Sequence, residues 1–135
     1  MLEVLPIQSK TEQETVCARC DMTYNADEMA YKAIIDGDLI GACQFTMNQN
    51  GGYIRNLGLV KDAEIPPKDR AEALFVMGRA TLNFIDLCGV HTAFFEDQTF
   101  TDEAMIKAIG FKKNENGAWW MDLTDFFLHP CQHEH

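Results

Sequence analysis

The stretch from Tyr53 to Glu96 decides the fold. It reads YIRNLGLV (53–60), KDAEIPPKD (61–69), RAEALFVMGRATLNFIDLCGV (70–90) and HTAFFE (91–96). The first and last segments are short runs rich in apolar and aromatic residues, which is typical of buried strands. The long segment between them is amphipathic, follows a Pro-Pro pair and ends at a glycine, which is typical of a helix. The expected product is a parallel strand pair joined by a crossover helix.

This unit also predicts where a ligand binds. In crossover units of this kind, ligands bind beyond the carboxyl ends of the strands and close to the N-terminus of the helix. We therefore expect a functional site in the segment from Val60 to Ala73.

The residues before the unit predict an edge strand and a helix. Leu2 to Ile7 is a short alternating run, and Pro6 within it cannot donate to a strand ladder, which favours the edge of a sheet. Ser9 and Glu12 have the spacing of a capping box, so a helix is expected from there to about Cys20.

A hairpin is expected next. The apolar runs YKAII and LIGACQFTMN flank the pair Asp36-Gly37, which is a strong hairpin signal. NQNGG (48–52) predicts a second turn before the strand Tyr53 to Val60. Three antiparallel strands therefore precede the crossover helix.

The residues after the unit predict a short helix and a last hairpin. Thr101 or Asp102 can cap a helix that ends at Gly110, and the final hairpin turns at Asn116-Gly117. The apolar face of this helix consists of Met105, Ile106 and Ile109.

Composition sets the class of protein. The 135 residues predict one domain spanning 1–135, and 47% hydrophobic residues are ordinary for a soluble globular protein. The net charge is −10, with 11 basic against 21 acidic residues, which argues against nucleic acid as a partner. No apolar run is long enough to cross a membrane, and no secretion signal is evident, so we expect a cytoplasmic protein without a membrane partner.

Several motifs, taken in order, resemble the GNAT superfamily of acyl-CoA-dependent N-acetyltransferases. They are DGDLIGACQF (36–45), NLGLV (56–60), CGV (88–90), HTAFFE (91–96) and IGF (109–111). The resemblance implies an α/β fold of the α+β kind with a mixed sheet. Its first strands are antiparallel, one parallel crossover pair splays into a V-shaped opening, and a hairpin ends the chain.

The resemblance also implies a reaction and a cosubstrate. Family members hold the pantetheine arm of acetyl-CoA in the V and its pyrophosphate at the start of the crossover helix. An amine acceptor, a small molecule or a peptide, attacks the thioester directly. By this resemblance the thioester lies near Leu59 and Val60, and the phosphates lie near Asp69, Arg70, Ala71, Glu72 and Ala73.

The sequence departs from the family in its phosphate loop and at its acid. The family has Arg or Gln followed at the third and fifth positions by Gly and Gly or Ala, but Arg70 is followed at those positions by Ala73 and Phe75. The family often has a Tyr four residues before the Gly-Phe pair, and Ile106 stands there. Tyr24 and Tyr31 are the nearest alternative acids, although Tyr31 fits a packing role in a strand.

The amine must lose a proton before it attacks, and Glu96 at the end of its strand is the candidate base. Solvated loop acids are the alternative interpretation of Glu96 and Asp97. A further alternative is an inert protein of the same fold that binds a partner or another small ligand, with Phe75 or Leu74 blocking the V.

The five cysteines leave a metal or thiol function open. Cys43 and Cys88 lie in strand and helix patterns and are expected to be small buried hydrophobic residues. Cys17 and Cys20 have the spacing of metal ligands or of a redox pair. With the tail they could form a zinc site; the alternative is a solvent-exposed thiol pair and a frayed tail. The tail residues concerned are His129, Cys131, His133 and His135.

Overall fold

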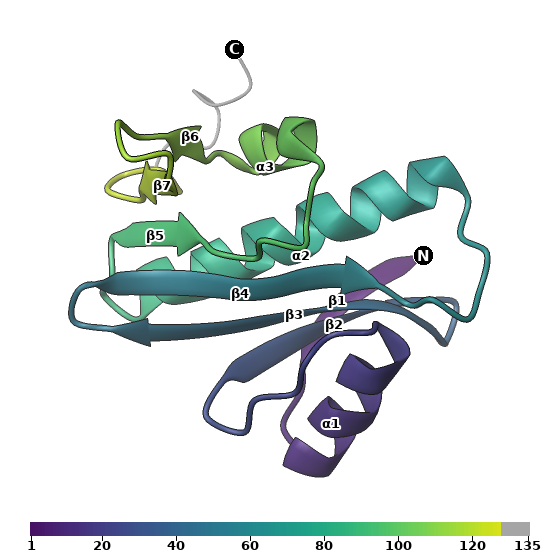
Figure 1. Cartoon of the computed structure of the whole chain (residues 1–135). Coiled ribbons are helices and arrows are strands. Elements are labelled where there is room, and N and C mark those ends of the chain that lie inside the picture. Colours follow the sequence, from purple (N-terminus) through teal and green to yellow (C-terminus); the bar gives the residue numbers. More distant parts are fainter. Residues whose placement is uncertain (128–135) are drawn as a thin grey trace.

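A computed structural model describes residues 1–127 of the chain and shows one mixed sheet with helices on both faces (Figure 1). The elements are β1 (Leu2–Pro6), α1 (Lys10–Arg19), β2 (Met29–Ile35), β3 (Asp38–Asn48), β4 (Gly51–Leu59), α2 (Pro67–Leu87), β5 (Thr92–Phe95), α3 (Glu103–Ile109), β6 (Lys112–Lys113) and β7 (Trp119–Asp122). Their order along the chain is the predicted one.

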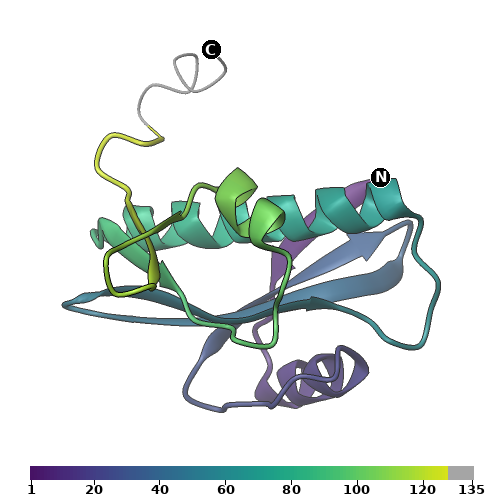
Figure 2. The same ribbon diagram turned by 45° about the horizontal axis from the view of Figure 1, so that its top comes forward.

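The sheet has the strand order β1-β2-β3-β4-β5-β7-β6. Only β4 and β5 run parallel among these neighbours, and the crossover helix α2 joins them. Helices α2 and α3 lie on one face of the sheet and α1 lies on the other (Figures 1 and 2). The predicted mixed sheet, its parallel pair and the final hairpin are therefore confirmed.

Local chemistry accounts for the ends of the elements. Asp36 and Gly37 have φ angles of 51° and 87°, the left-handed values that the tight turn between β2 and β3 requires. Ser9 accepts a hydrogen bond from the Glu12 backbone N–H at 3.2 Å at the start of α1. Asp102 does the same for the Met105 N–H at 3.1 Å at the start of α3.

Helix α2 buries one stripe against the sheet. Ala73, Met77 and Ile85 are fully buried, and a Cβ atom added at Gly52 of β4 would lie 2.6 Å from Ile85 Cδ1. A glycine is thus needed where the helix approaches the strand most closely. Cys88 is exposed, contrary to the sequence prediction, because it caps the C-terminus of α2.

Strand β4 carries a β-bulge in its middle. Gln44 of β3 pairs with Asn56, while the next residue, Phe45, pairs with Ile54, so that Arg55 is an extra residue on β4. A bulge bends its strand and redirects the side chains beside it. Here it lies where β4 and β5 part.

None of the helices within residues 1–127 is both long and apolar enough to cross a membrane.

Candidate functional site

Strands β4 and β5 stay paired over a short distance only. Their register matches Gly52 with Ala93 and Ile54 with Phe95, and the Glu96 N–H then donates to the Ile54 carbonyl at 2.8 Å. Strand β4 continues to Leu59 while β5 ends at Phe95. The two strands therefore diverge beyond this point, as the V-shaped opening requires.

Asp97 bridges the apex of this divergence. Its Oδ2 accepts a hydrogen bond from the Leu57 N–H at 2.9 Å, and its Oδ1 accepts from the N–H and the hydroxyl of Thr99 at 3.0 and 2.6 Å. The residue is 8% exposed, so the interpretation of Asp97 as a solvated loop acid is wrong. Its carboxylate takes the place of the strand carbonyl that would continue the ladder.

Leu59 provides the next amide along β4 on the same side. The Val60 N–H donates to the Ile40 carbonyl at 2.8 Å, back toward β3. Because neighbouring residues of a strand direct their N–H groups to opposite edges, the Leu59 N–H points toward the divergence, as the Leu57 N–H does. The position of a thioester near Leu59 and Val60 remains a prediction.

Leu74 and Phe75 are the two residues expected to block the V in an inert protein. Leu74 is buried in the core with the rest of the inner face of α2. Phe75 is partly buried and packs beneath the guanidinium of Arg79, with 4.7 Å between the Arg79 Cζ and the ring centroid. The group that spans the apex is the Asp97 carboxylate instead.

A cavity of about 490 Å³ lies at the N-terminus of α2. Pro66 is the N-cap residue and makes no side-chain cap, and the first intrahelical bond of this turn runs from the Arg70 N–H to the Pro66 carbonyl at 2.9 Å. The N–H groups of Lys68 and Asp69 have no intrahelical acceptor, since they precede the first complete turn. The cavity is lined by Ala63, Glu64, Ile65, Pro66, Pro67 and Arg70.

Arg70 is therefore the one predicted phosphate-binding residue that lines this cavity within the described chain. Ala73 is fully buried in the core and cannot present its side chain to a ligand there. Ala71 and Glu72 are exposed on the helix, and Asp69 is partly buried. The whole lining falls within the segment from Val60 to Ala73 that the sequence singled out, although Ala63–Pro67 was not among the residues named for phosphate binding.

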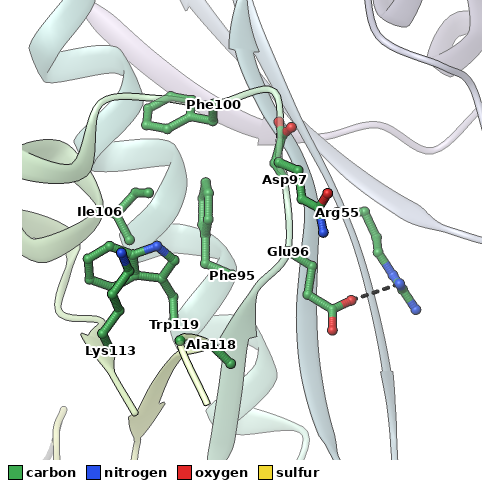
Figure 3. Close-up of a pocket in the computed structure, with 11 residues that line it drawn as sticks. Arg55, Phe95, Glu96, Asp97, Phe100, Ile106, Lys113, Ala118 and Trp119 are labelled. Carbon is green, nitrogen blue, oxygen red and sulfur yellow. Dashed lines mark hydrogen bonds and ion pairs between the residues drawn. The ribbon is translucent and has the colours of Figure 1, made fainter. Parts of the chain in front are cut away.

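A second cavity, of about 640 Å³, opens at the end of β5 (Figure 3). Its apolar wall is made of aromatic and aliphatic side chains, and its rim is charged. Ile106, at the position of the family Tyr, belongs to the apolar wall and is 2% exposed. The cavity is lined by Arg55, Phe95, Glu96, Asp97, Gln98, Phe100, Ile106, Lys113, Gly117, Ala118 and Trp119.

The candidate base Glu96 lies at the rim of this cavity. Its side chain is 40% exposed, and its Oε1 accepts a hydrogen bond from Arg55 Nη1 at 2.8 Å (Figure 3). Arg55 also lies over the Tyr53 ring, with 5.4 Å between its Cζ and the ring centroid. The sequence prediction missed Arg55, because a bulge has no recognisable motif in this strand.

The alternative acids lie elsewhere. Tyr31 stacks on Phe45 with 5.8 Å between ring centroids, which confirms its packing role, and burial raises the pKa of its hydroxyl. Tyr24 is partly buried in the loop before β2. Neither lines either of the two cavities described above.

Cys17 and Cys20 are buried between α1 and the sheet, so the expected solvent-exposed thiol pair is wrong. Burial, which is the largest cause in both cases, raises the pKa of Cys17 to about 11 and that of Cys20 to about 12. Within residues 1–127, no group of three His, Cys, Asp or Glu side chains is arranged to hold a metal ion. His129, Cys131, His133 and His135 lie outside the described residues.

This burial predicts which thiols react. With iodoacetamide at about pH 8, we expect Cys88 to be alkylated before Cys17, Cys20 and Cys43, because a buried thiol with a raised pKa supplies little thiolate. Peptide mapping by mass spectrometry of native and denatured protein measures the order. Rapid alkylation of Cys17 in the native protein would contradict the buried position of this thiol.

Comparisons with known proteins identify the fold. No protein-family model and no curated protein sequence match the chain. Among solved structures, a putative GNAT acetyltransferase of Desulfovibrio desulfuricans has a TM-score of 0.68 at 9% identity, covering 91% of this chain and 99% of that chain. A Bacillus subtilis acetyltransferase in complex with CoA has a TM-score of 0.66 at 13% identity, with the same coverages of 91% and 99%.

A third match extends the comparison to an enzyme whose acceptor is a protein. The ribosomal-protein-S18-alanine N-acetyltransferase of Escherichia coli has a TM-score of 0.62 at 10% identity, covering 89% of each chain. At these identities the likeness concerns the arrangement of the elements. The chain has the fold of the GNAT superfamily of N-acetyltransferases.

Proposed function

We propose that this protein is an N-acetyltransferase that moves an acetyl group from acetyl-CoA to an amine. The observation that carries the proposal is the position of the two cavities. One lies at the N-terminus of α2, and the other lies at the end of β5, where β4 and β5 diverge on a GNAT fold. A cosubstrate with a phosphate end and a reactive thioester end fits such an arrangement.

The N-terminus of α2 is suited to the pyrophosphate. Its open amides and the positive end of the helix dipole favour a phosphate, and Arg70 adds a positive charge at the cavity. Glu64, which lines the same cavity, opposes this charge. The glycine-free loop is compatible with the proposal, because backbone amides at a helix start exist whatever the side chains are.

The cavity at the end of β5 is suited to the acceptor. Its aromatic wall, with Phe95 and Trp119, can hold an apolar body, while Glu96 at its rim of mixed charge can hold an ammonium group. In the reaction, the amine nitrogen attacks the thioester carbon, the carbon–sulfur bond breaks, and CoA leaves as a thiolate. Ile106 has no proton to give, so the thiolate departs without a dedicated acid from that position.

The attacking amine also loses a proton, and a carboxylate near the cavity is the natural acceptor. Glu96 is the candidate that the sequence singled out. Its exposed position at the rim allows contact with an amine in the cavity.

Calorimetric titration with acetyl-CoA tests the cosubstrate. We expect saturable binding in the micromolar range, and Arg70→Glu should weaken it about tenfold, which corresponds to about 1.4 kcal/mol. The reason is that the substitution places a carboxylate beside the pyrophosphate. Lys112→Glu, the same charge change on β6 away from the α2 N-terminus, is the matched control and should bind as the wild type does.

Absence of binding at millimolar acetyl-CoA would contradict the proposal. The chain would then have the fold without the activity, which is the inert alternative of the sequence analysis.

A further inference from the structure

Glu28 is a buried carboxylate that the proposed reaction has not used. It lies immediately before β2, and the residue is 7% exposed. Its Oε1 is buried and has no hydrogen-bond partner among residues 1–127. Buried polar atoms are nearly always paired in native proteins, because an unpaired one loses its water without compensation. An exception of this kind is characteristic of a functional site.

The rest of Glu28 is held firmly. Its backbone carbonyl accepts hydrogen bonds from Lys10 Nζ at 2.5 Å and from Gln13 Nε2 at 3.1 Å, both on α1. Its Oε2 accepts from Asn25 Nδ2 at 3.3 Å and lies 3.6 Å from Arg55 Nε. The carboxyl group is therefore fixed through one oxygen, which leaves the other for a partner that binds later.

Four charged groups from different parts of the fold surround Glu28. Burial raises the pKa of its carboxyl above the ordinary glutamate value, and Asp27 beside it and Glu96 after β5 add to this. Arg55 on β4 and Lys10 on α1 act in the opposite sense. The net effect is a carboxyl group that takes up a proton more readily than an exposed glutamate does.

Arg55 connects Glu28 to the acceptor cavity. Its Nε faces Glu28 Oε2 and its Nη1 donates to Glu96 Oε1, so a single guanidinium lies between the two carboxylates. Arg55 and Glu96 line the cavity. Glu28 is not among the lining residues, and it contacts the Arg55 side chain. A route between the cavity and Glu28 therefore passes Arg55, and a water molecule can carry a proton along such a route.

We propose that Glu28, rather than Glu96, accepts the proton that the amine loses during acetyl transfer. This inference rests on the proposed function. The proton moves from the ammonium group of the acceptor to the Glu28 carboxylate, the free amine attacks the thioester carbon, and the proton later leaves Glu28 for solvent. Glu96 holds Arg55 at the rim and keeps the path between the cavity and Glu28 in place.

The test compares Glu28→Gln with the wild type, using acetyl-CoA as donor and 2-phenylethylamine or spermidine as the amine. We expect kcat/KM to fall about 100-fold while acetyl-CoA binding by calorimetry stays unchanged. The wild-type pH profile should have an acidic limb set by a pKa above the ordinary glutamate value, and Glu28→Gln should lack that limb. Glu96→Gln should keep the acidic limb of the pH profile, and its kcat/KM should fall less than tenfold.

The stability of Glu28→Gln shows whether Glu28 acts as a proton acceptor or only supports the structure. A glutamate whose folded-state pKa is raised contributes stability that is full below its unfolded-state pKa and is lost as the pH rises through its raised folded-state pKa. At neutral pH the wild type therefore keeps a destabilising buried charge. Glu28→Gln is neutral and nearly the same shape, so it should be at least as stable there. Glu14→Gln, on the exposed side of α1, is the matched control and should change neither activity nor stability.

The outcomes distinguish the two proposals. If Glu28→Gln transfers acetyl groups as fast as the wild type and keeps the limb, the role of Glu28 is refuted and the acetyltransferase stands. If wild-type protein does not bind acetyl-CoA, or binds it and acetylates neither amine, the proposed reaction fails and the role of Glu28 fails with it.

Discussion

Replacing Gln44 by leucine is expected to lower the free energy of unfolding by about 4 kcal/mol. Gln44 is fully buried on β3. Its Oε1 accepts hydrogen bonds from Gln13 Nε2 at 2.9 Å and the Asn25 N–H at 3.2 Å, and its Nε2 donates to the Thr23 carbonyl at 2.7 Å and Asn56 Oδ1 at 2.8 Å. One side chain thereby joins α1, the loop before β2, β3 and β4.

Leucine fills the space and pairs with none of these groups. Gln13 keeps its bonds to the carbonyls of Asn25 and Glu28, but the other three groups lose a partner in partly buried positions. Each buried group left unpaired costs about 1–3 kcal/mol. Thermal unfolding should show a midpoint lower by roughly 10–15 °C.

Gln8→Leu is the control, because Gln8 is exposed after β1 and the chemical change is identical. It should shift stability by less than about 0.5 kcal/mol. An equal, small effect of both substitutions would show that the network around Gln44 contributes no net stability.

Replacing Asp97 by alanine is expected to cost about 2–3 kcal/mol. The substitution removes the acceptor of the buried Leu57 N–H and the oxygen that accepts from both the N–H and the hydroxyl of Thr99. Hydrogen bonds to a carboxylate are stronger than those between neutral groups, which places the loss in the upper part of the usual range. Urea unfolding measures the cost, and hydrogen exchange should show faster exchange at the Leu57 amide.

The free energy of unfolding of Asp97→Asn should lie between those of Asp97→Ala and the wild type. The reason is that an amide has one acceptor oxygen, which can accept from either Leu57 or Thr99. Glu115→Ala, in the exposed β6–β7 turn, controls for loss of an acidic side chain. If the Leu57 amide exchanges at the wild-type rate in Asp97→Ala, the carboxylate does not hold the apex of the divergence.

Local signals in the sequence predict most of the fold. Turns and helix caps depend on residues that are close together in the sequence, so they can be predicted from it. Examples are the Asp36-Gly37 pair, the Ser9 and Asp102 caps and the glycine after α2. The strand after the NQNGG turn begins at Gly51, earlier than the predicted Tyr53. The reason is not local: Gly52 pairs with Ala93 of β5, which is distant along the chain.

The site is less accessible to sequence reasoning. Glu96 lies at the predicted place, yet Asp97, Arg55 and Glu28 acquire their surroundings from strands and helices that are distant along the chain. An acid after a strand is most often solvated. Only the divergence of β4 and β5 brings the Leu57 N–H to Asp97, and only the bulge brings Arg55 to Glu28.

The cysteines show the same limit. Cys17 lies in a helix with many polar residues, and Cys20 directly follows it. The polar composition gives no sign that the side carrying these two cysteines faces the sheet. Cys88 continues the apolar spacing of α2 but lies where the helix has already ended. Burial at the ends of elements depends on what covers them, and that is decided by the tertiary arrangement.

Arg55 is an extra residue on β4, so the chain length at this point can change without altering which strand residues pair. Because of it, Arg55 and Asn56 follow one another on the α1 side of the sheet, while Ile54 and Leu57 both enter the core. Exchanging Arg55 for alanine removes a charge and leaves every neighbour in place. Losing its codon would join Ile54 to Asn56 directly, so Phe45 and Gln44 would keep their partners on β4, Asn56 would stay on the α1 side and Leu57 would stay in the core. Natural variation at this position should therefore accept deletion of the residue as well as its substitution, and a deletion would remove the bend that the bulge gives β4.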